Sequence, residues 1–137
     1  MDIRLKAKRV HESYTRAGGA AMIPVFYDKL INASSEIKEK FDQVDMNAQS
    51  NFLAHAIVMS FLFVDPDHQV AARTINNVRL SHNHEHLNIE PHLYDTWLSC
   101  LIETVAECDP DANEQLLIDW HKVMLVAVNH IKNGHKG

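Results

Sequence analysis

The sequence predicts an all-α fold for a single domain that spans residues 1–137. Two observations lead to this prediction. Only 4 glycines and 4 prolines interrupt the 137 residues, and the segments between them are long enough for helices. Within these segments apolar residues recur at helical spacing, and no segment shows the strict alternation, bounded by hairpin turns, that is typical of half-buried strands.

Glycine and serine separate the first three helices. The pair Gly18-Gly19 ends the first helix, because glycine favours the position that follows a helix. Pro24 fits the first turn of the second helix, where the backbone N–H that proline lacks would have no helical partner. Ser34 or Ser35 then serves as the N-cap of a short third helix.

Aspartate and proline separate the later helices. The fourth helix has a wide apolar stripe and ends at Asp65-Pro66, and the fifth is a weaker helix that leads into a histidine-rich segment. Pro91 opens a strongly apolar sixth helix, and Asp111 begins an amphipathic last one. We therefore expect helices at residues 3–17, 20–31, 35–41, 46–64, 69–84, 91–107 and 111–132.

The composition argues against several classes of protein. Hydrophobic residues make up 46% of the chain, too many for a disordered polypeptide, and the net charge of -5 does not suit a nucleic-acid binder. The basic cluster at residues 4–9 is typical of a solvated helix face. The longest apolar run, residues 56–64, is far shorter than the roughly 20 residues of a membrane span. We expect a soluble cytoplasmic protein without a nucleic-acid or membrane partner, in which Cys100 and Cys108 are free thiols.

Three histidines on alternate residues stand in the segment L-S-H-N-H-E-H-L-N-I-E-P-H-L-Y, residues 80–94. In a strand, His82, His84 and His86 would share one face and could chelate Zn, Ni or Cu. At the end of a helix, only His82 and His86 align, whereas His84 points to another side together with Leu80. Helical geometry therefore favours His84 as a single ligand and leaves the other two histidines as surface neighbours.

The run that begins at His84, H-x-x-L-x-I-x-P-x-x-Y, resembles the proximal segment of bacterial globins: flavohaemoglobins, single-domain bacterial haemoglobins and the globin domains of haem sensors. The resemblance implies a globin fold, a three-over-three helical sandwich around haem b (iron protoporphyrin IX). It also implies that His84 is the axial ligand of the iron, and that Leu80 packs under the haem. The other residues that carry this part of the resemblance are Leu87, Ile89, Pro91 and Tyr94.

The N-terminal half of the chain carries a second part of the resemblance, on the side that corresponds to the distal face of the haem. Phe41 follows Tyr27 by fourteen residues, as does the phenylalanine on the haem face of these globins after their distal tyrosine. The stretch that follows resembles their distal helix and implies that Gln49 and Leu53 are pocket residues. His55 is a rival distal residue, 29 residues before His84, but choosing it would turn the polar end of its helix inward.

The resemblance implies a five-coordinate haem that binds O2, CO and NO reversibly, with Tyr27 donating a hydrogen bond to bound O2. Oxygen transport and NO scavenging are uses that such a pocket permits. The alternatives are a gas sensor that signals to a separate partner, an NO dioxygenase that needs an external reductase, and a haem-free metal-binding module. The glutamate of the flavohaemoglobin proximal network would fall at His135, fifteen residues after Trp120, so we expect no catalysis without a partner. The sequence leaves open whether the protein forms a homodimer.

Overall fold

The protein is built from helices alone in the part of the chain that the structure describes. The computed structural model covers residues 2–42, 45–83 and 85–136, and it confirms the predicted all-α fold. None of the helices in these ranges is long and apolar enough to cross a membrane. The elements are α1 (Ile3–Arg16), the 3-10 helix η1 (Gly19–Met22), α2 (Ile23–Ala33), α3 (Ser35–Phe41), α4 (Met46–Leu62), α5 (Gln69–Ser81), α6 (His92–Cys108) and α7 (Glu114–Lys132).

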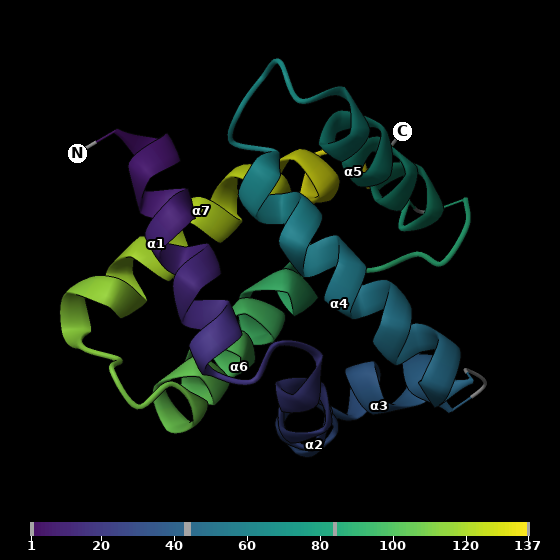
Figure 1. Ribbon diagram of the computed structural model, residues 1–137. Coiled ribbons are helices and arrows are strands. Elements are labelled where there is room, and N and C mark those ends of the chain that lie inside the picture. The colour runs from purple at the N-terminus through teal and green to yellow at the C-terminus, as the bar shows by residue number, and fades with distance from the viewer. Residues whose placement is uncertain (1, 43–44, 84, 137) are drawn as a thin grey trace.

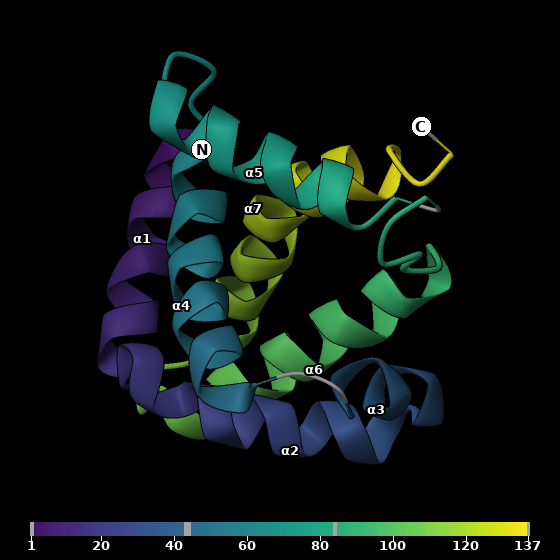
Figure 2. The same ribbon diagram turned by 90° about the vertical axis from the view of Figure 1, so that its right-hand side faces the viewer.

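The helices form two layers of three, with α1, α4 and α5 in one layer and α2, α6 and α7 in the other. Within the layers α4 contacts both α1 and α5, and α6 contacts both α2 and α7. Between the layers α7 packs on α1 and α5 (Figure 1). Seen from the side, α5 lies at the top of the molecule and α2 and α3 lie at the bottom (Figure 2). This is the three-over-three arrangement that we expected.

The predicted second helix divides into η1 and α2. Gly18 and Gly19 have φ angles of 112° and 58°, in the left-handed region that other residues enter only with strain. The chain emerges from this turn into 3-10 geometry, and regular α geometry starts at Ile23. Pro24 then occupies the first turn of α2, as predicted.

Asparagine side chains set two helix boundaries, which differ from the predicted ones. The fifth helix ends at Ser81 and not at residue 84, because the Asn83 side chain accepts a hydrogen bond from the backbone two residues later, at 3.1 Å, and turns the chain. The last helix begins at Glu114 and not at residue 111. There the side chain of Asn113 accepts the backbone N–H three residues later at 2.9 Å and acts as the N-cap.

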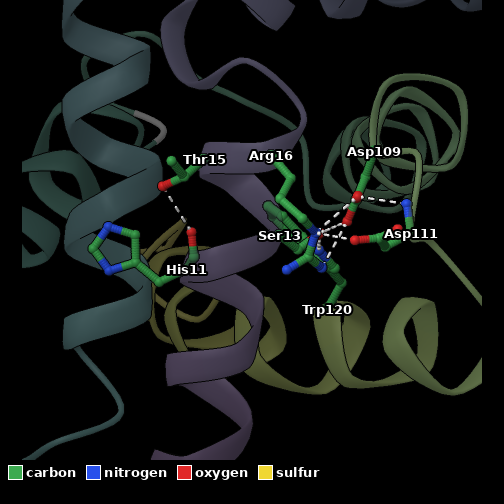
Figure 3. Close-up of polar contacts among 7 residues, drawn as sticks. All are labelled: His11, Ser13, Thr15, Arg16, Asp109, Asp111 and Trp120. Atoms are coloured by element: carbon green, nitrogen blue, oxygen red, sulfur yellow. Dashed lines mark hydrogen bonds and ion pairs between the residues drawn. The ribbon is translucent and has the colours of Figure 1, made fainter.

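A buried carboxylate joins α1 to the corner between α6 and α7 (Figure 3). Asp109 is 3% exposed, and both of its oxygens accept hydrogen bonds from the guanidinium of Arg16 at 3.0 Å. The hydroxyl of Ser13 donates to the same carboxylate at 2.5 Å and accepts from the indole N–H of Trp120 at 3.0 Å. Burial alone would raise the pKa of Asp109, but the hydrogen bonds from Arg16 and Ser13 outweigh it and hold the pKa below its ordinary value.

We expect Asp109→Asn to lower the free energy of unfolding by about 2 to 4 kcal/mol at pH 7, because it leaves Arg16 facing a neutral group at a buried site. A lowered carboxylate pKa stabilises the fold above the ordinary aspartate value of 3.8, and the contribution is lost as the pH falls through the folded pKa. Urea unfolding curves of the two proteins should therefore differ at pH 7 and converge in acid.

Asp111→Asn is the matched control. Its side chain is 72% exposed and lies 3.5 Å from Nε of Arg16, so its loss should cost less than about 0.5 kcal/mol. Equal losses in the two variants would show that the Asp109 carboxylate has no special part in stability.

Candidate cofactor pocket

A largely apolar cavity lies between the two layers, and every described α-helix except α1 contributes to its wall. Ligand pockets typically combine such a wall with a few polar groups that fix the orientation of the ligand. The side chains with polar atoms on the wall are Tyr27, Lys40, Gln49, Ser60, His82, Tyr94 and Trp97. The apolar ones are Ile37, Phe41, Phe52, Leu53, Ala56, Ile57, Ile75, Val78, Leu87, Ile89, Leu93, Met124, Val128 and Ile131.

Tyr27 brings a buried hydroxyl without a partner to this wall. It belongs to the inward stripe of α2, and its ring packs edge-on against Phe41 with centroids 5.2 Å apart. Its Oη is buried and has no hydrogen-bond partner among the described residues. Burial raises the pKa of Tyr27 to about 12. The nearby side chain of Gln49 lowers this pKa by less than burial raises it, although it lies outside hydrogen-bonding geometry with Oη. The hydroxyl therefore keeps its proton at pH 7 and can donate a hydrogen bond to a ligand.

The α4 residues that we predicted as pocket residues do line the cavity. Gln49 and Leu53 lie one turn apart on the face of α4 that continues to Ile57. His55 is two residues beyond Leu53, which turns it to the other side of the helix, and it is exposed and absent from the cavity wall. The structure therefore brings Gln49, and not His55, to the cavity.

His82 is half-buried and lines the cavity, which corrects the expectation that it lies on the surface. It follows Ile75 and Val78 on the inward face of α5 and caps the end of that helix. Its Nδ1 lies 3.0 Å from Oη of Tyr94, and its Nε2 has no partner in the described ranges. Burial lowers the pKa of His82 to about 4, so the imidazole is neutral at pH 7.

The other predictions for the histidine segment have different outcomes. Leu80 does not reach the cavity: it is 59% exposed, because it lies two residues beyond Val78 and so on the outer side of α5. His86 is exposed, as expected, and its Nδ1 lies 2.7 Å from the side-chain oxygen of Asn83. His84 lies outside the described residues, and its role as a ligand stays a prediction.

The remaining predicted pocket residues, Leu87, Ile89 and Tyr94, all line the cavity. Leu87 is 56% exposed and stands at the rim. Asn88, which follows it, has a φ of 51°, and this left-handed residue reverses the loop between Leu87 and Ile89.

Sequence reasoning did not assign most of the wall, and the missed residues that carry polar atoms are Lys40, Ser60, His82 and Trp97. His82 and Trp97 could have been found from helical phase, because His82 lies four residues after Val78 and Trp97 lies three after Tyr94. Lys40 lies three residues after Ile37 and shares its helical phase, but a lysine is typical of a solvated helix face, and its position at the cavity depends on how α3 packs against the loop that follows α5.

A bare metal site is not supported in the described part of the chain. Within it, no three side chains of histidine, cysteine, aspartate or glutamate come together in a group that could hold an ion. His82 forms its hydrogen bond with Tyr94, and His86 forms its own with Asn83. The two histidines thus act separately.

Comparison with solved structures finds a match over nearly the whole chain. A protein from Pseudomonas aeruginosa PAO1, described as structurally highly homologous to a human hemoglobin, superposes with a TM-score of 0.87. The match covers 96% of this chain and 99% of that chain, at 30% sequence identity. No family model and no curated protein sequence matches the chain.

The Tyr27 hydroxyl should lower the stability of the ligand-free protein. We expect Tyr27→Phe to raise the free energy of unfolding by about 1 kcal/mol, because it removes a buried hydroxyl that makes no hydrogen bond. Tyr94→Phe is the matched control, and it should lower that free energy by about 1 kcal/mol, since it breaks the bond to His82. Chemical denaturation of the ligand-free proteins measures both; a loss of stability in Tyr27→Phe as large as in Tyr94→Phe would contradict the assignment.

Proposed function

This chain belongs to the globin family as a bacterial single-domain member, and on that basis we propose that its cavity binds haem b and that the protein binds O2 reversibly. The observation that carries the proposal is the unpartnered hydroxyl of Tyr27, which is buried on the α2 side of a cavity that His82 lines from the α5 side. Figure 2 shows α2 and α5 on opposite sides of the molecule.

The cavity wall fits a porphyrin. A flat, largely apolar macrocycle needs apolar side chains on both of its faces and around its edge. Side chains of six α-helices surround the cavity in this way. When bound, haem would supply an iron centre with one position open to a diatomic gas such as O2, CO or NO.

We assign the iron ligand to His82. Haem iron takes a neutral imidazole nitrogen, and the second ring nitrogen of such a histidine normally donates to a protein group. His82 meets both requirements, since its lowered pKa keeps the ring neutral and Tyr94 is in place to accept from Nδ1–H. That tautomer leaves the lone pair of Nε2 for the metal. The sequence-based prediction gave this role to His84 instead. The glycine variants described below distinguish the two histidines.

On the side of the cavity where a gas would bind, Tyr27 keeps its proton at Oη and can donate a hydrogen bond to a bound diatomic ligand. Gln49 adds a second polar side chain on the same part of the wall. The bond from Tyr27 would slow the release of O2, which is the ligand of the three that takes most negative charge on binding.

The surroundings of Tyr94 favour reversible binding over catalysis. The hydroxyl of Tyr94 meets the neutral ring of His82, while His135 bonds to the side chain of Asn88 at 2.9 Å and lies 4.0 Å from a carboxylate oxygen of Glu90. In the described ranges no carboxylate forms a hydrogen bond with Tyr94. We therefore place oxygen binding ahead of NO dioxygenation with an external reductase, and ahead of gas sensing through a partner.

The purified protein should show an intense Soret band that shifts on reduction and on addition of CO. A colourless protein that takes up no added haem would overturn the proposal.

His82→Gly should lose most of its haem, and added imidazole should restore the band, because the free base can enter the space left by the side chain. His84→Gly and His86→Gly are the matched controls and should keep the spectrum. If His84→Gly were instead the variant that loses haem and regains it with imidazole, the ligand would be His84.

Tyr27→Phe should speed the release of O2 by about tenfold, the effect of losing one hydrogen bond of about 1.4 kcal/mol. Flash photolysis or stopped-flow mixing measures the rate. CO makes a much weaker hydrogen bond, so its release serves as the internal control, and equal changes for the two gases would mean that the phenol acts by shape alone.

A further inference from the structure

Helix α5 forms part of the cavity wall and packs against α4 and α7 at the top of the molecule (Figure 2). The apolar contact between α5 and α7 belongs to a second, smaller cluster of buried residues beside the main core. The buried members of this cluster are Ile75, Val78, Tyr94, Ala127, Val128 and Ile131. Because so few side chains are buried there, the polar bonds between α5 and α7 contribute a large share of the contact.

Arg79 of α5 makes such a polar connection to α7. Its Nη1 donates to the backbone oxygen of His130 at 2.9 Å and lies 3.3 Å from Nδ1 of the same residue. This carbonyl belongs to the last turn of α7, where the final backbone oxygens lack helical partners and the helix dipole favours a cation. Arg79 thus caps the C-terminal end of a neighbouring helix.

Gly134 leaves room for the Arg79 side chain. It lies two residues after the end of α7, and a Cβ atom at this position would collide with Cγ of Arg79 and lie 2.6 Å from its Nε. Heavy atoms that are not bonded to each other do not approach so closely. The contact between Arg79 and His130 therefore depends on the absence of a side chain at position 134.

The hydrogen bonds of the His130 ring require its neutral form. Arginine has donors only, so Nδ1 accepts from Arg79 and carries no proton. Nε2 then carries the single ring proton and donates a hydrogen bond to the side-chain oxygen of Asn76 at 2.6 Å. A second proton, at Nδ1, would end the bond from Arg79 and place two positive charges side by side.

The surroundings of His130 oppose that second proton. Arg79 and Asn76 face the ring from α5, and the ring of Phe63, at the end of α4, lies 5.3 Å from it. On α7 itself, the residues three and four positions away in either direction carry no charge. Burial and then the charge of Arg79 lower the pKa of His130 from its ordinary value of 6.5. The neutral ring therefore stabilises the fold above that value, and the contribution is lost as the pH falls through the folded pKa.

The same two helices close one side of the cavity. Val78 lines it from α5, and Val128 and Ile131 line it from α7. Arg79 directly follows Val78, and His130 directly precedes Ile131, so the connection lies on the outer side of this wall. A separation of α5 from α7 would therefore open the cavity.

We propose that Arg79, His130 and Gly134 form a pH-sensitive latch that holds α5 on α7, and that protonation of His130 releases α5 and opens the cavity. The inference goes beyond the proposed function, because it concerns how the cavity opens, whichever ligand it holds.

The test is hydrogen–deuterium exchange of the purified full chain at about pH 7.5 and about pH 5. The rates are expressed as protection factors, which correct for the intrinsic effect of pH on exchange. In the wild type, protection of residues 75–81 of α5 should fall about three- to tenfold in acid, the effect of losing one partly exposed hydrogen bond from a charged group. Protection of α1 should change much less, since α1 lies outside the latch.

Two variants act on the latch from different sides. His130→Gln is uncharged at both pH values, so protection of residues 75–81 should no longer depend on pH. Gly134→Ala retains both polar partners but displaces Arg79, so protection should already be low at pH 7.5 and fall little further in acid. His121→Gln removes an exposed histidine of the same helix and is the matched control, with the acid response of the wild type.

Two other histidines of this region are distinguished from the latch. Nδ1 of His68 accepts the backbone N–H of Ala71 at 3.2 Å, so acid would also loosen the first turn of α5. His68→Asn retains an N-cap that does not titrate, and it should leave the acid response of residues 75–81 unchanged. The pKa of His82, about 4, lies below the range of the measurement.

The rate at which bound haem passes to an excess of a haem-scavenging apoprotein reports on the opening of the cavity. This rate should rise in acid for the wild type and rise much less for His130→Gln. An equal loss of α5 protection in the two proteins would overturn the latch, and an equal acid response of their haem loss would overturn its control of the cavity. A wild type that takes up no haem would overturn the proposed function, and the exchange measurements would still decide whether the latch exists.

Discussion

The structure depends on keeping an apolar cavity open inside a small protein. Apolar side chains that face a hollow lose the contacts they would make in a filled core, so the helices around it must be held in place elsewhere. The buried Asp109 carboxylate does this at the end of the molecule where α1, α6 and α7 meet. Helix α7 links the two regions, since Trp120 lies in that network and Met124 and Val128 lie on the cavity wall.

Buried polar groups serve two opposite purposes here. Asp109 has both oxygens bonded, to Arg16 and to Ser13, and a buried charge satisfied in this way stabilises one arrangement of helices. Tyr27 has a buried hydroxyl with no partner among the described residues. Such a group destabilises the ligand-free fold and remains available to a ligand, which makes it an indication of function that stability alone does not explain.

In the histidine segment, residues 80–94, the sequence predicted some of the residues that line the cavity but not all of them. Three residues of this segment that the resemblance placed in a pocket, Leu87, Ile89 and Tyr94, line the cavity. The residue that the structure brings there from α5 is His82, whereas Leu80 is exposed. Helical phase on α5 accounts for both observations, since it brings His82 to the same side as Val78 and turns Leu80 outward. His84 lies outside the described residues, and its role as a ligand stays a prediction.

The sequence by itself determined the helical class and the order of the helices, because apolar spacing, caps and breakers are local properties. The pairing of Tyr27 with Phe41 followed from the resemblance of the chain to bacterial globins. Only the tertiary structure decided which side chains from different helices and loops meet at the cavity. It brings Tyr94 within 3.0 Å of His82, and it places Lys40 beside a loop 47 residues further along the chain. Contacts across such separations follow from the angles at which helices cross and from where each helix ends, and a difference of one or two residues at a helix end changes the side chain that is presented.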